Sequence, residues 1–314
     1  PVNMAAGNWP NYCSSPFDAL IYGDKNKKYV FGVDPAAEDD NFAIVILEVH
    51  SEHVRVVYTW TINKEKFKKF RHLHNEDEQN YYAYCARKIR DLMRKFPCSG
   101  IAMDPQGGGV AVQEALQDRD KMREGEVAIL PIVDPDKEAE TDNLPGNHII
   151  LNCSFSSADW VRDSNNGLRK DMEEKGLLFP QFNSIILGLA SEKTNVQDDD
   201  GILYDNLEFC MTEIEELKNE LSIITVTNVG NRQRWDTPEV KTGLKTKSNL
   251  KKDRYSALLM ANWLARTTAR AIAPPTFNFV GGAVGSIRQE IKSSEYHGPD
   301  WYKVSQDCFR GVQR

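Results

Sequence analysis

The sequence predicts a mixed α/β domain, in which an antiparallel meander continues into parallel strands and helices cover both faces of the sheet. Three short runs of β-branched and aromatic residues follow one another at 28–34, 42–49 and 53–62. The links between them are short, which favours antiparallel neighbours. After these runs, helix and strand patterns alternate along the chain, an order typical of crossover connections.

The segments after the meander lead to a second strand that ends in an aspartate. Residues 77–96 carry aromatic and aliphatic side chains at helical spacing. Residues 99–104 have the pattern of a strand ending in Asp104, and a glycine-rich turn after it opens a helix. A further strand is expected at 127–133.

Helices dominate the remaining part of the predicted domain. Helical segments are expected near 157–175 and 206–220, followed by a hairpin at 221–236 that turns at an Asn-Val-Gly-Asn sequence. A basic loop then leads to a strong helix at 252–270.

Composition sets the expected limits of this domain. Residues 1–24 are rich in Pro, Asn, Gly and Ser and have no period, so we expect a linker or N-terminal tail. The α/β domain is expected to span 25–270, and 271–314, where Pro- and Gly-rich sequence returns, to be a C-terminal tail. The six cysteines are scattered without a CxxC pair, which indicates reduced thiols in a cytosol-like compartment. No apolar run approaches the length of a membrane span.

Charge is segregated along the chain. The net charge of −7 argues mildly against a nucleic-acid partner, since such proteins usually carry a basic footprint. Residues 231–270, however, hold ten Lys and Arg against three Asp and Glu. This segment is therefore the candidate for contact with an anionic partner.

Three aspartates occupy corresponding positions in the predicted topology. Asp34 ends the first strand, Asp104 ends the fourth, and Asp253 lies in the first turn of the last helix. If the first and fourth strands are neighbours, their aspartates emerge side by side at an edge where α/β sheets bind ligands. The same face of that helix carries small side chains: Ser256, Ala257 and Ala261. Small residues would let the helix lie close to the sheet and bring its carboxylate to the other two.

Three carboxylates in one place favour a divalent cation. Their pKa values would rise by mutual repulsion unless a cation were present. Hard oxygen ligands suit Mg²⁺ or Mn²⁺, and the lack of a neighbouring histidine argues against zinc. Two such ions about 4 Å apart activate a water and stabilise the leaving oxygen of a phosphodiester. Taken singly, each aspartate also has an ordinary explanation as a turn former or as a helix N-terminal partner.

The acidic segments resemble a known family. The stretches "GVDPAAEDDNFAIVIL", "IAMDPQGGGVAVQEAL" and "KKDRYSALLMANWLA" are similar to the three acidic motifs in the nuclease domain of tailed-phage terminase large subunits. The likeness spans roughly residues 28–268. It implies an RNase H-like fold and two divalent ions held by Asp34, Asp104 and Asp253. Asp40 matches a second acid of the first motif, and we expect it to support the loop.

The resemblance also implies an activity and partners. The chain would be a metal-dependent endonuclease that cuts concatemeric viral DNA during genome packaging, in the cytoplasm of the infected host cell. Its substrate would be double-stranded DNA, bound largely without sequence preference. A phosphate-binding loop of the form GxxxxGK[ST] is absent, so we expect the nuclease half alone, without ATP chemistry. In the full motor its partners would be an ATPase domain, the portal and the small terminase subunit, and no membrane is involved.

The basic segment is expected to contact DNA phosphates across the cleft. The residues concerned are Arg232, Arg234, Lys241, Lys245, Lys247, Lys251, Lys252 and Arg254. A solvated charged loop is an equal alternative for them. Trp235 is expected to be a hairpin core residue.

Three other functions compete with this interpretation. A Holliday-junction resolvase or RNase H would want a further His or Asp one turn before the last acid, where Leu250 stands. An actin- or kinase-like ATPase would need a phosphate loop after Asp34, which Pro35-Ala36-Ala37 does not supply. From a different class, the chain would be a non-catalytic docking module whose tail after Ala271 binds a partner such as the portal ring.

Overall fold

The structure is a computed structural model. It describes residues 2–3, 17–35, 40–70, 78, 80–132, 145–181, 184–185, 188, 206–230, 232–238, 241–242, 245–246 and 250–269. The chain divides into a unit Pro1–Ile272 and a unit Ala273–Arg314. The second unit, and with it the predicted tail at 271–314, lies outside the described residues. Within the described part, no helix is long and apolar enough to cross a membrane.

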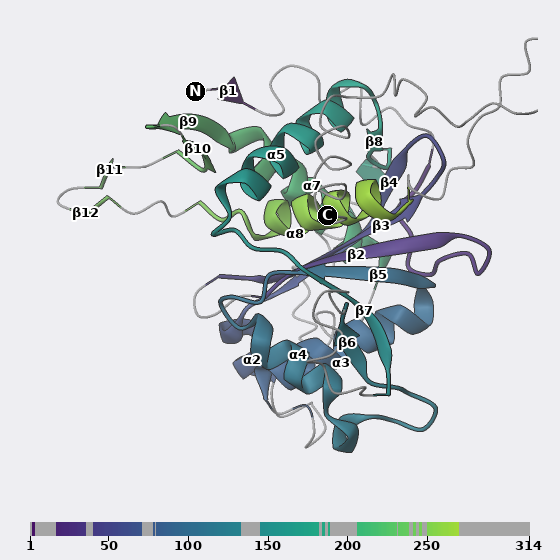
Figure 1. The fold of residues 1–314 in the computed structure, drawn as a ribbon. Coiled ribbons are helices and arrows are strands. Elements are labelled where there is room, and N and C mark those ends of the chain that lie inside the picture. The colour runs from purple at the N-terminus through teal and green to yellow at the C-terminus, as the bar shows by residue number, and fades with distance from the viewer. Residues whose placement is uncertain are drawn as a thin grey trace, which may run out of the picture. The chain divides into compact units, whose positions relative to one another are not determined.

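One mixed sheet forms the centre of the first unit (Figure 1). Seven strands of the described chain build it in the order β6-β7-β5-β2-β3-β4-β8. Their bounds are β2 Lys28–Asp34, β3 Phe42–Val49, β4 Val54–Ile62, β5 Cys98–Met103, β6 Ile129–Pro131, β7 Asn147–Asn152 and β8 Leu177–Leu178. The meander β2-β3-β4 is antiparallel, whereas β5 pairs parallel with β2, β7 with β5, and β6 with β7. This arrangement confirms the predicted mixed sheet, in which an antiparallel meander continues into parallel strands.

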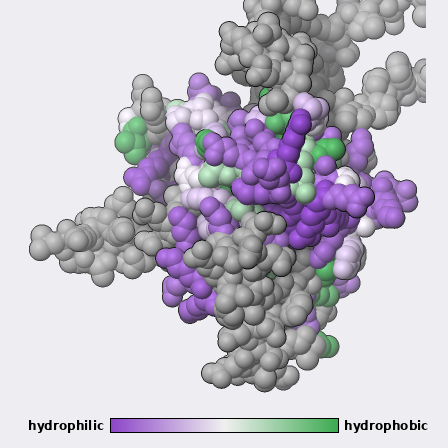
Figure 2. All heavy atoms as spheres, turned by 90° about the horizontal axis from the view of Figure 1, so that it is seen from below, coloured by the Kyte–Doolittle hydropathy of each residue, from purple (hydrophilic) through white to green (hydrophobic). Residues whose placement is uncertain are grey.

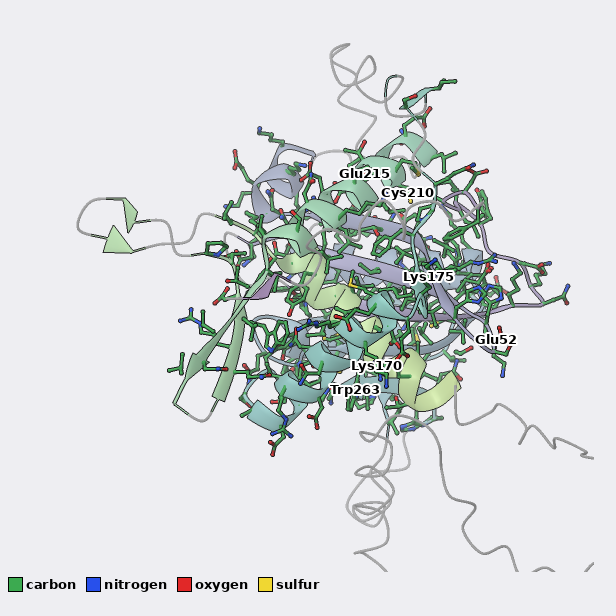
Figure 3. All side chains as sticks on the ribbon, turned by 90° about the horizontal axis from the view of Figure 1, so that it is seen from above. Glu52, Lys170, Lys175, Cys210, Glu215 and Trp263 are labelled. Atoms are coloured by element: carbon green, nitrogen blue, oxygen red, sulfur yellow. The ribbon has the colours of Figure 1, made fainter. Side chains whose placement is uncertain are left out.

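Helices lie on both faces of the sheet (Figure 1). The helices are α2 Lys64–Phe70, α3 Tyr81–Lys95, α4 Gly109–Gln117, α5 Ala158–Glu173, α7 Leu207–Ile223 and α8 Asp253–Leu264, with short helices η3 Arg119–Lys121 and η6 Ala265–Ala269. One face is covered by α8, which packs on β2, β3 and β5 and runs between α5 and α7 (Figure 3). The other face carries α3 and α4. Seen from that side, the described residues in view are mostly hydrophilic, with smaller apolar areas between them (Figure 2).

Burial on both faces explains why the central strand β3 is apolar at nearly every position. Seven of the eight residues of β3, Phe42–Glu48, are buried, with no alternation between core and solvent. A strand covered on one face only would alternate, whereas one between two helical layers does not need to. On the α3 side, Tyr58 packs against Phe96, and Trp60 packs against Tyr84.

A smaller sheet extends from α7. Its strands are β1 Val2–Asn3, β9 Thr225–Val229 and β10 Arg232–Asp236, in the order β1-β9-β10. The predicted hairpin is therefore confirmed, although α7 continues to Ile223 before it begins. Trp235 is buried and joins the core cluster, as expected. The strands β11 Lys241–Thr242 and β12 Lys245–Thr246 pair with each other beyond it.

The fold differs from the expectation in several places. Helix α2 and the strands β1, β7, β11 and β12 were not predicted. Residues 17–24, assigned to the linker, pack on the sheet instead: Ala19 is buried, and Leu20 N donates to the Val57 carbonyl at 2.8 Å. The folded part of the chain thus begins before residue 25, because a short apolar segment around Ala19 packs beside β4.

Candidate functional site

Two of the predicted aspartates lie at the ends of neighbouring strands. In the parallel pair β2-β5, Val33 is in register with Met103, and each residue immediately precedes one of the aspartates, Asp34 and Asp104. The turn after Asp104 needs glycine at 109, where an added Cβ would meet the Asp104 carbonyl oxygen at 1.9 Å. The glycine-rich turn therefore folds back directly onto the residue that carries the carboxylate.

The third aspartate reaches this edge through the close approach of α8 to β2. A Cβ added to Gly32 would lie 1.9 Å from the Ala257 carbonyl oxygen and 2.8 Å from the Ala261 Cβ. Real Cβ atoms do not approach so closely, so only glycine on the strand and small residues on the helix permit this packing. The expectation that small residues let the helix lie against the sheet is confirmed.

The electrostatics of Asp34 show that the acids lie within reach of one another. Burial raises its pKa well above the ordinary value, and the charges of Asp253, Asp104 and Asp40 raise it further. A hydrogen bond from the Ser256 hydroxyl acts in the opposite direction. Asp34 is thus a partly buried carboxyl group surrounded by like charge, an environment that a nearby cation would relieve.

Each of the other two aspartates is oriented by a backbone amide. Burial raises the pKa of Asp104, and its Oδ1 accepts a hydrogen bond from Gln106 N at 2.9 Å, which lowers it. Burial also raises the pKa of Asp253, and its Oδ2 accepts from Asn41 N at 2.8 Å. These bonds fix one oxygen of each carboxylate.

Asp40 belongs to the same electrostatic group. It is exposed and lies at the end of the β2-β3 connection, next to Asn41. Its charge raises the pKa of both Asp34 and Asp253. Whether it supports the loop, as the sequence suggests, stays a prediction. The neighbouring acids Glu38 and Asp39 lie outside the described residues.

The donor set fits a hard divalent cation, although the carboxylates are not gathered tightly. Among the described residues, no three His, Cys, Asp or Glu side chains are arranged to hold a metal ion. Holding one therefore requires the carboxylates to move closer together than they are here.

The unpredicted strand β7 brings further polar groups to this edge. Asn152 pairs in register with Met103, and its Oδ1 accepts a hydrogen bond from Gln113 Nε2 at 2.8 Å. Burial raises the pKa of Cys153 to about 12, and the charge of Asp104 adds to the effect. The signal in the sequence was a polar residue that ends a short apolar run, as in the other two strands.

The basic residues fall into different environments. Arg234 is exposed and pairs with Asp236 at 2.8 Å, and Lys252 pairs with the same carboxylate at 3.0 Å. Lys251 lies near enough to Asp253 to lower its pKa. Arg232, Lys241 and Lys245 lie in β10, β11 and β12, and Lys247 lies outside the described residues.

Arg254 requires a correction to its expected role in DNA contact. Its side chain is only 11% exposed, and it forms ion pairs at 2.7 Å with Glu213 and with Glu220, both of which are buried. Its guanidinium group is thus turned to α7 and is not placed on the surface for a phosphate. The sequence could not show this, because α7 and α8 are far apart along the chain.

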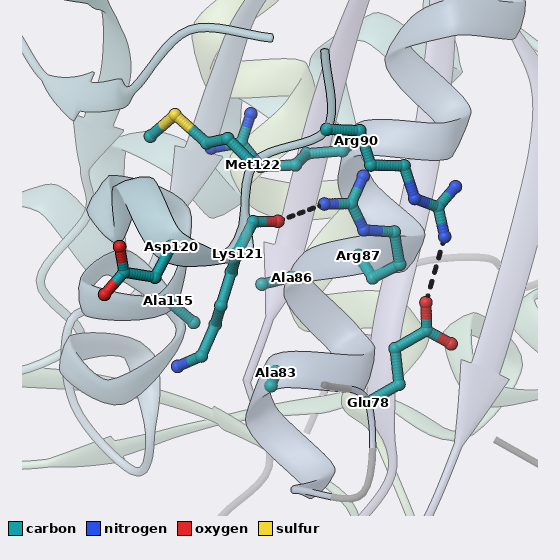
Figure 4. A pocket seen from close by; sticks show the side chains of 10 residues that line it. Glu78, Ala83, Ala86, Arg87, Arg90, Ala115, Asp120, Lys121 and Met122 are labelled. Atoms are coloured by element: carbon teal, nitrogen blue, oxygen red, sulfur yellow. Dashed lines mark hydrogen bonds and ion pairs between the residues drawn. The ribbon is translucent and has the colours of Figure 1, made fainter. Parts of the chain in front are cut away.

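A separate cavity of about 150 Å³ lies between α3 and α4 (Figure 4). Its walls combine small alanines with charged side chains of both signs, and Arg87 donates to the Lys121 carbonyl across it. Asp34, Asp104 and Asp253 do not line this cavity. It is therefore distinct from the carboxylate group at the sheet edge.

Comparisons with known proteins find similarity only among solved structures. No protein-family model matches the sequence, and no curated protein matches it. The large terminase nuclease from thermophilic phage G20c is 11% identical at a TM-score of 0.47, covering 83% of this chain and 97% of that one. The same nuclease with bound magnesium is 10% identical at a TM-score of 0.48, covering 84% and 98%. The HK97 bacteriophage large terminase is 11% identical at a TM-score of 0.43, and the match covers 83% of this chain and 42% of the HK97 protein.

Proposed function

We propose that this chain is a metal-dependent endonuclease that cuts concatemeric viral DNA during genome packaging. The observation that carries the proposal is the convergence of Asp34, Asp104 and Asp253 at one edge of the sheet. Holding three like charges together is unfavourable for the fold, so a cation-binding role accounts for them better than three independent turns or caps.

The chain's own residues would prepare this site for ions. Asp34, Asp104 and Asp253 would hold two divalent ions, Mg²⁺ or Mn²⁺. When bound, such ions lower the pKa of water and stabilise charge that develops on the phosphate and the leaving oxygen. The amides of Gln106 and Asn41 keep one oxygen of Asp104 and of Asp253 directed.

The hydroxyl of Ser256 does the same for Asp34. These partners come from the strand-end loops and from α8, and they direct one oxygen of each carboxylate. Ion binding would then need the three carboxylates to move closer together, with these hydrogen bonds guiding their orientation.

The substrate would be double-stranded DNA, held through its phosphates. Arg234, Lys251 and Lys252 are the described basic side chains that support this, because they lie on the hairpin and on the approach to Asp253. Contacts to phosphates position DNA without reading its sequence. We further propose that the chain acts in the cytoplasm of the infected host cell. Its partners there would be a packaging ATPase domain, the portal and the small terminase subunit, and ATP would not be its own cofactor.

Plasmid cleavage tests the proposal. Supercoiled plasmid is incubated with the chain and Mg²⁺ or Mn²⁺, and the products are separated on a gel. Wild type is expected to nick and linearise the plasmid, while Asp34→Asn, Asp104→Asn and Asp253→Asn lose this activity. Asp159→Asn, an exposed acid in the first turn of α5, serves as the matched control and should cut like wild type. Intact plasmid with wild type, or full activity in the three variants, would contradict the proposal.

A further inference from the structure

Two glutamates of α7 hold the first turn of α8, the helix that carries Asp253. Glu213 and Glu220 are separated by about two helical turns, so they share one face of α7. Arg254 Nε donates to Glu213 Oε2, and Arg254 Nη1 donates to Glu220 Oε1, each at 2.7 Å. We call Glu213, Glu220 and Arg254 the α7–α8 clamp.

The clamp replaces an ordinary helix cap. The N-cap residue of α8, Lys252, makes no side-chain capping hydrogen bond. Instead, Tyr255 N donates to Glu220 Oε2 at 2.9 Å. The first amides of a helix need partners outside the helix, and here a neighbouring helix supplies one. One carboxylate therefore holds both the Arg254 side chain and the backbone of the first turn.

The clamp is also tied to the sheet. Thr61, on β4, donates through Oγ1 to Glu213 Oε2 at 2.7 Å. On the other side of the turn, Asn41 N donates to Asp253 Oδ2 at 2.8 Å. The start of α8 is thereby fixed to α7, to β4 and to the β2-β3 connection at once.

We propose that Arg254, held by Glu213 and Glu220, is a positioning residue that sets Asp253 in place for ion binding. The inference rests on the proposed function, since it assumes that Asp253 is a metal ligand. Buried ion pairs contribute little net stability compared with apolar side chains of similar size. Apolar side chains would be sufficient to pack this region. A positioning role explains why the charged Arg254 lies next to Asp253 instead.

Two readouts on Arg254→Lys test the clamp. The substitution keeps the positive charge and removes the forked geometry that reaches both glutamates. Mn²⁺ affinity, measured by electron paramagnetic resonance of the free ion, is expected to fall about 10- to 100-fold. Amide hydrogen exchange at Tyr255 and Ser256 in the metal-free protein is expected to be faster.

Two further variants separate positioning from general stability. Arg87→Lys disturbs a comparable pair, Arg87 with Glu126 at 2.7 Å, on the other face of the sheet. It should lower the melting temperature without changing Mn²⁺ affinity. Glu213→Gln weakens one partner of Arg254 but keeps the hydrogen bond from the Tyr255 amide to Glu220. This variant should weaken Mn²⁺ binding, and it tests the clamp independently of whether Arg254→Lys folds.

The outcomes distinguish this inference from the function on which it rests. If wild type binds Mn²⁺ and cuts DNA while Arg254→Lys and Glu213→Gln bind Mn²⁺ like wild type, the clamp inference is overturned and the proposed function stands. Equal losses of affinity in Arg254→Lys and Arg87→Lys would also overturn it. If wild type binds no Mn²⁺, the proposed function fails first, and the inference fails with it.

Discussion

At the scale of single residues, Asp34 differs most from an ordinary strand-end aspartate. Asp104 also forms a local turn, because its Oδ1 accepts from Gln106 N two residues on. Asp253 lies where a helix favours negative charge. The Asp34 carboxylate gains a hydrogen bond from Ser256, yet burial and the charges of three neighbouring aspartates raise its pKa well above the ordinary value. Its charge therefore opposes folding unless a cation compensates it.

Neutralising Asp34 should stabilise the metal-free protein while abolishing cutting. Asp34→Asn keeps the shape and an acceptor for Ser256 but removes the charge that Asp104 and Asp253 repel. We expect a gain of about 1 kcal/mol or more in the free energy of unfolding, measured by urea denaturation in EDTA near neutral pH.

A control and a contrary result are available for this prediction. The pKa of Asp118 is lowered by a hydrogen bond from Lys121, so Asp118→Asn should give no gain. A metal-free Asp34→Asn protein less stable than wild type would show that the repulsion is not the dominant effect at this position.

At the scale of elements, the packing of α8 on β2 decides where Asp253 lies. In Gly32→Ala, the added Cβ would meet the Ala257 carbonyl oxygen at 1.9 Å, so the helix must move away from the strand. We expect a loss of about 1–3 kcal/mol in the free energy of unfolding. Mn²⁺ binding should weaken as well, because Asp253 moves with the helix.

Gly100→Ala is the matched control for Gly32→Ala. Gly100 lies on the neighbouring strand β5, where the nearest atom to an added Cβ belongs to the Leu264 side chain, at 3.2 Å. A side chain yields more easily than backbone, so a smaller loss in stability and unchanged Mn²⁺ binding are expected. If the two substitutions had the same mild effect, the close approach of α8 would not be required.

The loop before β6 is attached to α3 by a group of arginines around Glu126. Burial raises the pKa of Glu126, but hydrogen bonds from Arg87, Arg94 and the Arg123 amide outweigh it and lower that pKa to about 2. The folded protein thus binds this proton less tightly than the unfolded chain does. The stabilisation is fully present above the unfolded pKa of about 4.5 and is lost as the pH falls towards about 2.

Glu126→Gln should therefore be destabilising near neutral pH and progressively less so in acid. We expect a loss of about 2–3 kcal/mol in the free energy of unfolding near neutral pH, because a buried charge pair is broken. Urea denaturation at about pH 7, 5 and 3 measures the difference between wild type and variant. A difference that stays constant over this range would show that the charge of Glu126 does not carry the stabilisation.

At the scale of the whole molecule, the surface charge around the sheet edge should govern DNA affinity. If Lys251 and Lys252 neutralise DNA phosphates, replacing both with Gln should weaken DNA binding. The slope of log affinity against log salt should then fall by about one for each phosphate that the variant no longer neutralises. Filter binding or fluorescence anisotropy in EDTA measures this without cleavage.

The matched control replaces two lysines on another part of the surface. Lys170 and Lys175 lie on α5 and just after it (Figure 3). Their substitution by Gln should leave the salt slope unchanged. An equal change in both double variants would indicate that only the net charge of the protein matters.

Much of this architecture could be predicted from local sequence, and the exceptions share a cause. The runs 28–34 and 42–49 coincide with β2 and β3 because each is mostly apolar and is bounded by charged or polar residues. Strand β7 has an apolar run of only three residues, 149–151, and is partly exposed, and it is a strand because it pairs with β5. Its identity therefore depends on partners that the local pattern does not contain.

In the candidate site too, some features follow from the local sequence and others depend on residues far away in the chain. Asp34 and Asp104 could be placed because their strands end at those residues, and the small residues after Asp253 indicated close packing. The ion pairs of Arg254 depend on α7 lying beside α8, with partners 34 and 41 residues away in the sequence. Side-chain partners at such separations are a property of the assembled fold.

Divalent-ion binding tests the central claim most directly. Mn²⁺ is titrated into the metal-free wild type and into Asp34→Asn, Asp104→Asn and Asp253→Asn, and bound ion is measured by electron paramagnetic resonance or calorimetry. Wild type is expected to bind two Mn²⁺ ions per chain, and each variant should lose at least one of them. Binding in the three variants that equals wild type, or no binding by wild type, would contradict the assignment of these aspartates to a metal centre.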